Sequence, residues 1–188
     1  MLHIVIISSN NIVAQESNAV FKNIALGTTL ENIVSMEGLP DLIYSRENRG
    51  NYSSIALIWA NPSTSNSELF EFIKNKNIQL SENISDIFNN YDQISIHYNN
   101  TNFLNYNSKM IIELNNNKLI DLSFYLKLTN REMRPNILRH FGNWYGEPER
   151  IEPFTLLWKL DNTKIVIEII SFLSNGEKED FMTIRYSR

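Results

Sequence analysis

The stretch GTTLENIVSMEGLP, from Gly27 to Pro40, carries the clearest fold signal in the chain. One of its two threonines can cap a helix, and Leu30 and Ile33 then follow at the spacing that places side chains on one helical face. Gly38 suits the left-handed position just after a helix, and the proline that closes the stretch prevents the helix from continuing. The stretch therefore predicts a short amphipathic helix.

A second stretch, TNREMRPNILRHFGNWYGEP from Thr129 to Pro148, has the same order of signals. Its threonine and asparagine can cap a helix, and Met133, Ile137 and Phe141 recur on one helical face. Gly142 is predicted to stop this helix, which would leave the segment NWYGEP as a loop.

Each predicted helix is followed by strands that pair in hairpins. The first strand after each helix ends in tryptophan: ALIW at 56–59 and TLLW at 155–158. Further strands alternate apolar and polar residues around turns, in the segments 109–128, 153–172 and 180–187. A helix laid across its sheet buries the apolar face of both. The sequence thus predicts an α+β fold of tandem helix-plus-antiparallel-sheet units, a two-layer α/β sandwich, over residues 16–128 and 129–188.

The pattern LGTTLENIVSMEGLPD followed by Trp59 resembles the SmpA/OmlA family of outer-membrane assembly lipoproteins. The residues that carry the resemblance are Gly27, Thr28, Thr29, Ile33, Val34, Gly38, Pro40 and Trp59. A tandem of this unit looks like the β-lactamase inhibitor protein fold, in which two repeats form a concave binding face. The chain has no cysteine and so departs from the lipoprotein pattern of that family. The resemblance implies a role in complex assembly or in enzyme inhibition.

Residues 1–15 resemble the end of a signal peptide. An apolar run covers 2–7, and small or aliphatic residues surround Ala14, where cleavage would fall. The alternative is a first β-strand, because HIVII at 3–7 is rich in β-branched residues. The first interpretation places the protein in the periplasm or outside a bacterial cell, although a cytoplasmic location stays open.

Composition excludes several classes of site. The chain has no cysteine, and its three histidines, His3, His97 and His140, have no metal-ligand spacing. The net charge of −4 argues against a general nucleic-acid binder, and no stretch is long and apolar enough to cross a membrane as a helix. We therefore expect no catalytic, cofactor or metal site, no nucleic-acid partner and no transmembrane span.

The predicted contact residues are Trp144, Tyr145 and Arg150, in the loop after the second helix. Two large aromatic rings beside an arginine are typical of protein contact surfaces. The alternative is that Trp144 folds back and closes the core. Further aromatic residues lie on or near the predicted strands and suit protein or glycan contact: Tyr91, Tyr98, Tyr106 and Tyr125.

These features favour a non-enzymatic, protein-binding module of a bacterial envelope or secreted compartment, with a partner and an oligomeric state that the sequence does not define. One alternative is a small metal-independent enzyme that uses carboxylates and tyrosine. It would require a deep pocket with convergent carboxylates of perturbed pKa. The other alternative is a structural subunit of a larger assembly, which would expose a large apolar patch.

Overall fold

The computed structural model describes residues 19–21, 24–49, 52–63, 71, 74–75, 80, 83–174 and 176–188. In chain order, its helices and strands are β1 (Ala19–Phe21), β2 (Ile24–Ala25), α1 (Leu30–Glu37), β3 (Leu42–Arg49), β4 (Tyr52–Ala60), α3 (Ile84–Asn90), β5 (Gln93–Phe103), β6 (Tyr106–Asn115), β7 (Lys118–Lys127), α4 (Met133–Tyr145), β8 (Glu149–Glu152), β9 (Thr155–Lys159), β10 (Lys164–Ser174) and β11 (Glu177–Ser187).

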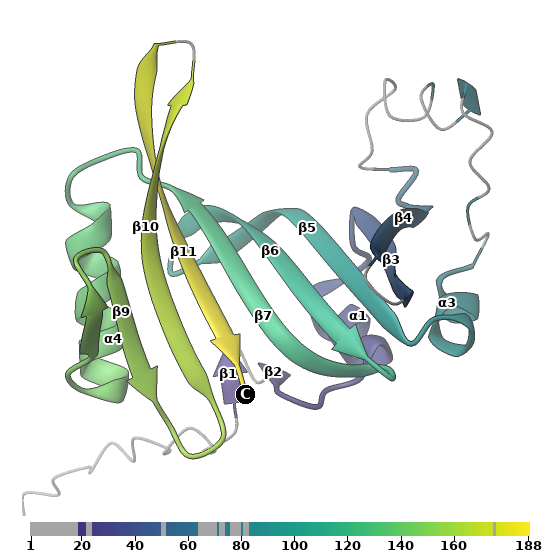
Figure 1. The fold of residues 1–188 in the computed structure, drawn as a ribbon, viewed down its shortest axis with the longest axis horizontal. Helices are drawn as coiled ribbons and strands as arrows, with labels where there is room; N and C mark the ends of the chain where they lie inside the picture. The colour runs from purple at the N-terminus through teal and green to yellow at the C-terminus, as the bar shows by residue number, and fades with distance from the viewer. Residues whose placement is uncertain are drawn as a thin grey trace, which may run out of the picture.

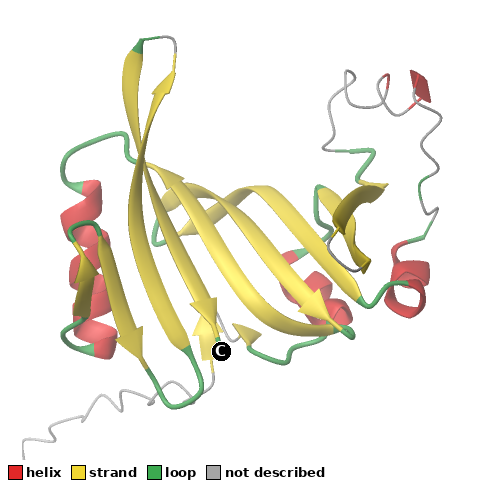
Figure 2. Cartoon of the chain, viewed as in Figure 1, coloured by secondary structure: helices red, strands yellow, loops and turns green. Residues whose placement is uncertain are grey.

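One continuous antiparallel sheet of nine strands dominates the fold, in the order β4-β3-β5-β6-β7-β11-β10-β9-β8 (Figures 1 and 2). The sheet is joined in its middle by the pairing of β7 with β11, from Lys127 opposite Phe181 to Asp121 opposite Ser187. The predicted two-layer α+β class is wrong, because the molecule is β-rich and its few helices are short. Local patterns located the helices and strands but could not show that distant strands pair in a single sheet.

Both tryptophans of the predicted strand ends lie on the same face of this sheet. Residues directly opposite one another in paired strands share a face. One such row crosses eight strands and contains Trp59, Ile43, Ile96, Ile112, Leu122, Tyr186, Ile165 and Trp158. All eight side chains are buried. A shared face is what a duplicated unit requires, and the duplication itself stays a prediction.

The helices cover this apolar face. Ile33 of α1, Ile87 of α3 and Ile137 of α4 belong to one hydrophobic cluster with the row of sheet residues. Phe141 of α4 is central, since its ring lies 5.5 Å from that of Trp158, measured between centroids. Burial of this one face against the helices leaves the other face of the central strands to carry polar side chains.

Several local predictions are confirmed. Helix α1 ends at Gly38, which has a φ of 82° and donates its N–H to Val34 O at 2.9 Å. The hairpin of β6 and β7 turns through Asn116 and Asn117, whose φ values of 48° and 57° fit the tight turn expected of an Asn-Asn pair. The hairpin of β9 and β10 and the final strand β11 also form as predicted.

Residues 1–15 lie outside the described residues, so the choice between signal remnant and first strand stays open. Much of the segment 66–77, whose sequence NSELFEFIKNKN could form a further helix, lies outside them as well. In the part of the chain that is described, no helix has the length and apolar character needed to cross a membrane.

Candidate functional site

The predicted contact residues lie elsewhere than expected. Helix α4 continues past Gly142 to Tyr145, and Gly146, with a φ of 78°, caps it by donating to the carbonyl of Gly142 at 2.9 Å. Trp144 and Tyr145 therefore belong to the last helical turn and not to a loop. Their predicted loop position is wrong because a helix tolerates Gly142, while positive φ favours glycine at 146.

These residues also differ in exposure. Trp144 is 47% exposed and so does not close the core, whereas Tyr145 is partly buried against it. Arg150 is exposed on the edge strand β8. Whether the three residues bind a partner stays a prediction.

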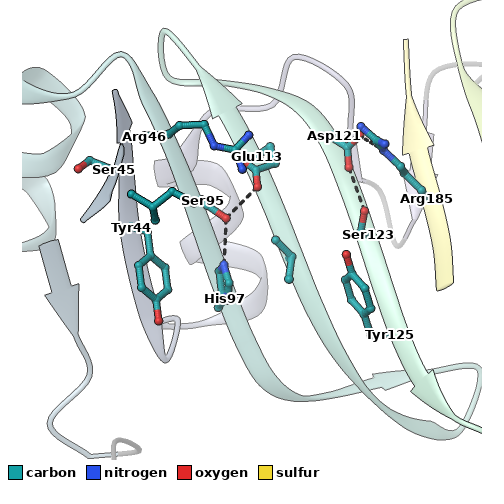
Figure 3. Close-up of a pocket in the computed structure, with 12 residues that line it drawn as sticks. Tyr44, Ser45, Arg46, Ser95, His97, Glu113, Asp121, Ser123, Tyr125 and Arg185 are labelled. Atoms are coloured by element: carbon teal, nitrogen blue, oxygen red, sulfur yellow. Dashed lines mark hydrogen bonds and ion pairs between the residues drawn. The ribbon is translucent and has the colours of Figure 1, made fainter. Parts of the chain in front are cut away.

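A polar cluster that sequence reasoning missed occupies the opposite, open face of the central strands (Figure 3). It surrounds a hollow of about 410 Å³. Ser45 of β3 lies at its margin, and the other polar side chains that line it come from five strands: Tyr44 and Arg46 of β3, Ser95 and His97 of β5, Glu113 of β6, Asp121, Ser123 and Tyr125 of β7, and Arg185 of β11. These nine side chains share one face of the sheet. Strand alternation places all of them opposite the buried row.

Glu113, Ser95 and His97 form a hydrogen-bonded chain in the hollow. Ser95 and Glu113 are direct cross-strand neighbours, and Ser95 Oγ donates to Glu113 Oε1 at 2.9 Å. His97 Nε2 lies 2.9 Å from the same Oγ. Because a hydroxyl has one proton, His97 donates from Nε2 whenever Ser95 donates to Glu113.

The surroundings of Glu113 and His97, at the two ends of this hydrogen-bonded network, favour the neutral forms of both side chains. Burial raises the pKa of Glu113 above its ordinary value, and the hydrogen bond from Ser95 opposes that rise. Burial lowers the pKa of His97, and the positive charge of Lys109 adds to the effect. The ring of Tyr44 packs beside the imidazole, 4.8 Å away between centroids. Glu113 and His97 are therefore each neutral over a wider pH range than a glutamate or a histidine in water.

Asp121 has a different environment from its neighbour Glu113. Arg185 Nε donates to Asp121 Oδ2 at 2.5 Å, and Ser123 Oγ donates to Oδ1 at 3.0 Å. The Asp121 side chain is 9% exposed, whereas that of Arg185 is 62% exposed. Asp121 and Glu113 lie directly opposite each other on β7 and β6. Two carboxyl groups in different environments therefore sit side by side on the sheet.

The central hollow continues in both directions along the strands. It shares His97, Ile111 and Tyr125 with a second hollow of about 570 Å³, which extends to Lys127 and Phe181. It shares Arg46, Glu113, Asp121 and Arg185 with a third of about 280 Å³, which extends to Gln93 and Arg188. We call these three adjoining hollows, with the residues that line them, the trough.

The strand alternation of β5 is the signal that could have located part of the trough. In the sequence, Ser95 and His97 alternate with Ile94 and Ile96, and the structure buries these two isoleucines in the core on the other face of the sheet. No local sequence pattern indicated that Arg185 lines the trough, because β11 lies beside β7 only in the folded sheet. No cluster of three or more metal-ligating side chains occurs in the described ranges.

Comparison with protein-family models, with curated proteins and with solved structures finds no match to this chain. The resemblance to SmpA/OmlA and to the β-lactamase inhibitor protein fold accordingly stays a prediction.

Proposed function

We propose that this protein is a non-enzymatic binding protein that recognises a protein partner through the trough on the open face of its sheet. The trough is the observation that carries this proposal. It is an extended hollow on a rigid sheet, lined by tyrosine, arginine, histidine and serine side chains. Tyrosine and arginine are enriched at the centres of protein interfaces.

Preorganisation of the trough supports binding. Asp121 is held by Ser123 and Arg185, and Glu113 is held by Ser95, so these groups lose little freedom when a partner docks. Tyr125 is 39% exposed beside them and offers a rigid ring for contact. A recognition surface on strands also keeps its geometry better than one on loops.

We further propose a periplasmic or secreted location in bacteria. The support is the character of residues 1–15, which resembles the end of a signal peptide. Cell fractionation tests this part separately. Recovery of the protein in the cytosolic fraction alone would contradict it.

Site-specific photo-cross-linking tests the binding proposal. The cross-linking residue p-benzoylphenylalanine replaces Tyr125 in the trough, Trp144 at the end of α4, or Phe154 near the outer edge of the sheet. All three native side chains are exposed, at 39%, 47% and 61%. In the cells that produce the protein, we expect one defined protein adduct from position 125 and none from position 154.

The comparison with position 144 decides between the two candidate surfaces. An adduct from position 144 alone would assign binding to Trp144, Tyr145 and Arg150 and overturn the trough proposal. Equal adducts from all three positions would show unspecific collision and would also count against it.

The pairing of Glu113 with Asp121 favours one alternative, a metal-independent enzyme. Glu113, with its raised pKa, would donate a proton, and Asp121, held by Arg185, would act as a base or nucleophile. Glycoside hydrolysis is a reaction that uses two such carboxyl groups. Turnover of a chromogenic glycoside that is lost in both Glu113→Gln and Asp121→Asn would support this alternative and contradict the non-enzymatic one.

A further inference from the structure

The charge of the trough differs from that of the whole protein. The chain as a whole has a formal net charge of −4. The trough is lined by five cationic side chains, Arg46, Lys109, Lys127, Arg185 and Arg188, and by two carboxylates, Glu113 and Asp121. The molecule as a whole is acidic, but its trough carries more cationic than anionic side chains, and a concave surface focuses their field.

Among the described residues, three of these five cations have no carboxylate within ion-pair distance. Arg185 pairs with Asp121, and Lys127 Nζ lies 2.6 Å from Glu179 Oε1. The ion pairs of the described residues leave Arg46, Lys109 and Arg188 without a carboxylate partner within 4.0 Å. Arg46 and Lys109 are both exposed, so a ligand can reach them.

The cations lie at separate points along the trough. Strand register orders the open face into successive rows that contain Arg46, then Glu113 and Asp121, then Arg185, then Lys109 and finally Lys127. Rows on one face of a strand are about 6.8 Å apart, so these five rows span about 27 Å. An extended polypeptide of about eight residues has that length.

We propose that the trough binds an extended, acidic segment of a partner polypeptide. Carboxylates of the segment pair with Arg46 and Arg188 at one end and with Lys109 at the other. Beside Lys109 the segment packs on Tyr125, and one row further along it packs on Phe181; both rings line the second hollow. This proposal rests on the proposed binding function and names the chemistry of the partner.

The two carboxyl groups of the trough favour a polypeptide over a nucleic acid. Glu113 and Asp121 are opposite each other in one row, which lies between the row of Arg46 and the row of Arg185. A nucleic acid places a negative charge at every phosphate and would bring some of them against these carboxylates. A polypeptide can place a neutral or basic residue there, which the carboxylates would bind.

A peptide-selection experiment tests the proposal. A random library of peptides of about twelve residues, longer than the trough, is panned against the wild-type protein and against two double variants. Arg46→Glu with Lys109→Glu reverses two charges in the trough. Arg131→Glu with Arg139→Glu is the matched control, because both residues are exposed and neither lines the trough.

We expect the wild type and the control to retain peptides enriched in Asp and Glu. The trough variant should bind a peptide from the enriched set about tenfold more weakly, because like charges now face each other. Binding should also weaken as salt concentration rises. Equal thermal unfolding of the two double variants would show that the loss does not come from misfolding.

Three results would overturn the proposal, and the first of them would do so without affecting the binding function. Retained peptides that are neutral or basic, yet lost in the trough variant, would leave the binding function intact and refute the acidic partner. A single-stranded oligonucleotide that binds more tightly than any peptide would replace the polypeptide with a nucleic acid. Failure to retain any peptide, together with the absence of an adduct from position 125, would remove both proposals.

Discussion

Glu113 and Asp121 lie directly opposite each other on β6 and β7, but among the residues that the structure describes only Asp121 has an arginine within ion-pair distance. Glu113 instead accepts a hydrogen bond from Ser95 and is largely removed from water, which raises its pKa. Removal of the charge of Glu113 should therefore stabilise the folded protein, whereas removal of the charge of Asp121 or Arg185 should destabilise it. The free energy of unfolding of single variants measures this difference.

Loss of Arg185 should destabilise the protein more than loss of its partner. Arg185→Met leaves the buried carboxylate of Asp121 without a cation and should lower the free energy of unfolding by about 2–3 kcal/mol. Asp121→Asn leaves an exposed guanidinium that water can solvate, and should lower it by about 1 kcal/mol. Urea unfolding at neutral pH measures both values. Equal losses would show that Asp121 is solvated.

Glu113 should make stability depend on pH. Its folded pKa is raised, so the folded state holds this proton more tightly than the unfolded state does. The associated stability is complete below the unfolded pKa, near 4.5, and is lost as pH rises through the folded pKa. Glu113→Gln stays neutral and should therefore gain stability relative to the wild type as pH rises from near 4.5 through the folded pKa of Glu113, with a constant difference at higher pH.

The control for this effect is His97, whose pKa is lowered. Its stability contribution is present above the unfolded pKa, near 6.5, and is lost as pH falls through the folded pKa. Chemical unfolding of the wild type, Glu113→Gln and His97→Gln over a series of pH values separates the two groups. A pH-independent difference between Glu113→Gln and the wild type would contradict the raised pKa.

Two tryptophans should differ sharply in their contribution to stability. Trp158 is 3% exposed, and its indole N–H donates to the carbonyl of Gly146 at 2.8 Å. Trp158→Ala should lower the free energy of unfolding by about 3–5 kcal/mol, as for other buried aromatic residues. Trp144→Ala removes a half-exposed ring and should lower it by about 1 kcal/mol or less. A large loss for Trp144→Ala would restore the core-closing alternative.

Asn117 should have two separable roles. Its φ of 57° is left-handed, and its Oδ1 accepts the N–H of Leu30 at 3.1 Å, which caps α1 from a distant hairpin. The residue before the helix, Thr29, makes no such bond. Asn117→Gly keeps the turn but loses the cap, which should lower the free energy of unfolding by about 1 kcal/mol.

Asn117→Ala loses the cap and also strains the turn, so its loss should be about 2 kcal/mol. Thermal or urea unfolding of the two variants measures the difference. Equal stability of the two variants would show that the left-handed conformation carries no strain here.

Local sequence patterns determined many elements of this protein. The spacing of Leu30 and Ile33 and the glycine at 38 predicted α1, and the asparagine run predicted the turn between β6 and β7. These features depend on residues within one or two turns of chain, so a short sequence contains the necessary information. The end of α4 was misplaced because two glycines, at 142 and 146, were equally good local stops, and packing of Tyr145 against Phe141 extends the helix to the second.

Only the tertiary structure decided the sheet and the trough. A two-residue turn at 116–117 would place Glu113 opposite Ile120. A register shift between Glu113 and Leu114 places Glu113 opposite Asp121 instead. Arg185 reaches Asp121 because β11 pairs with β7, a contact between residues far apart in the chain. Such pairings depend on which strands bury their apolar faces together under the helices. The strand pairing is determined by the packing of the whole core, so it cannot be predicted from any single segment of the sequence.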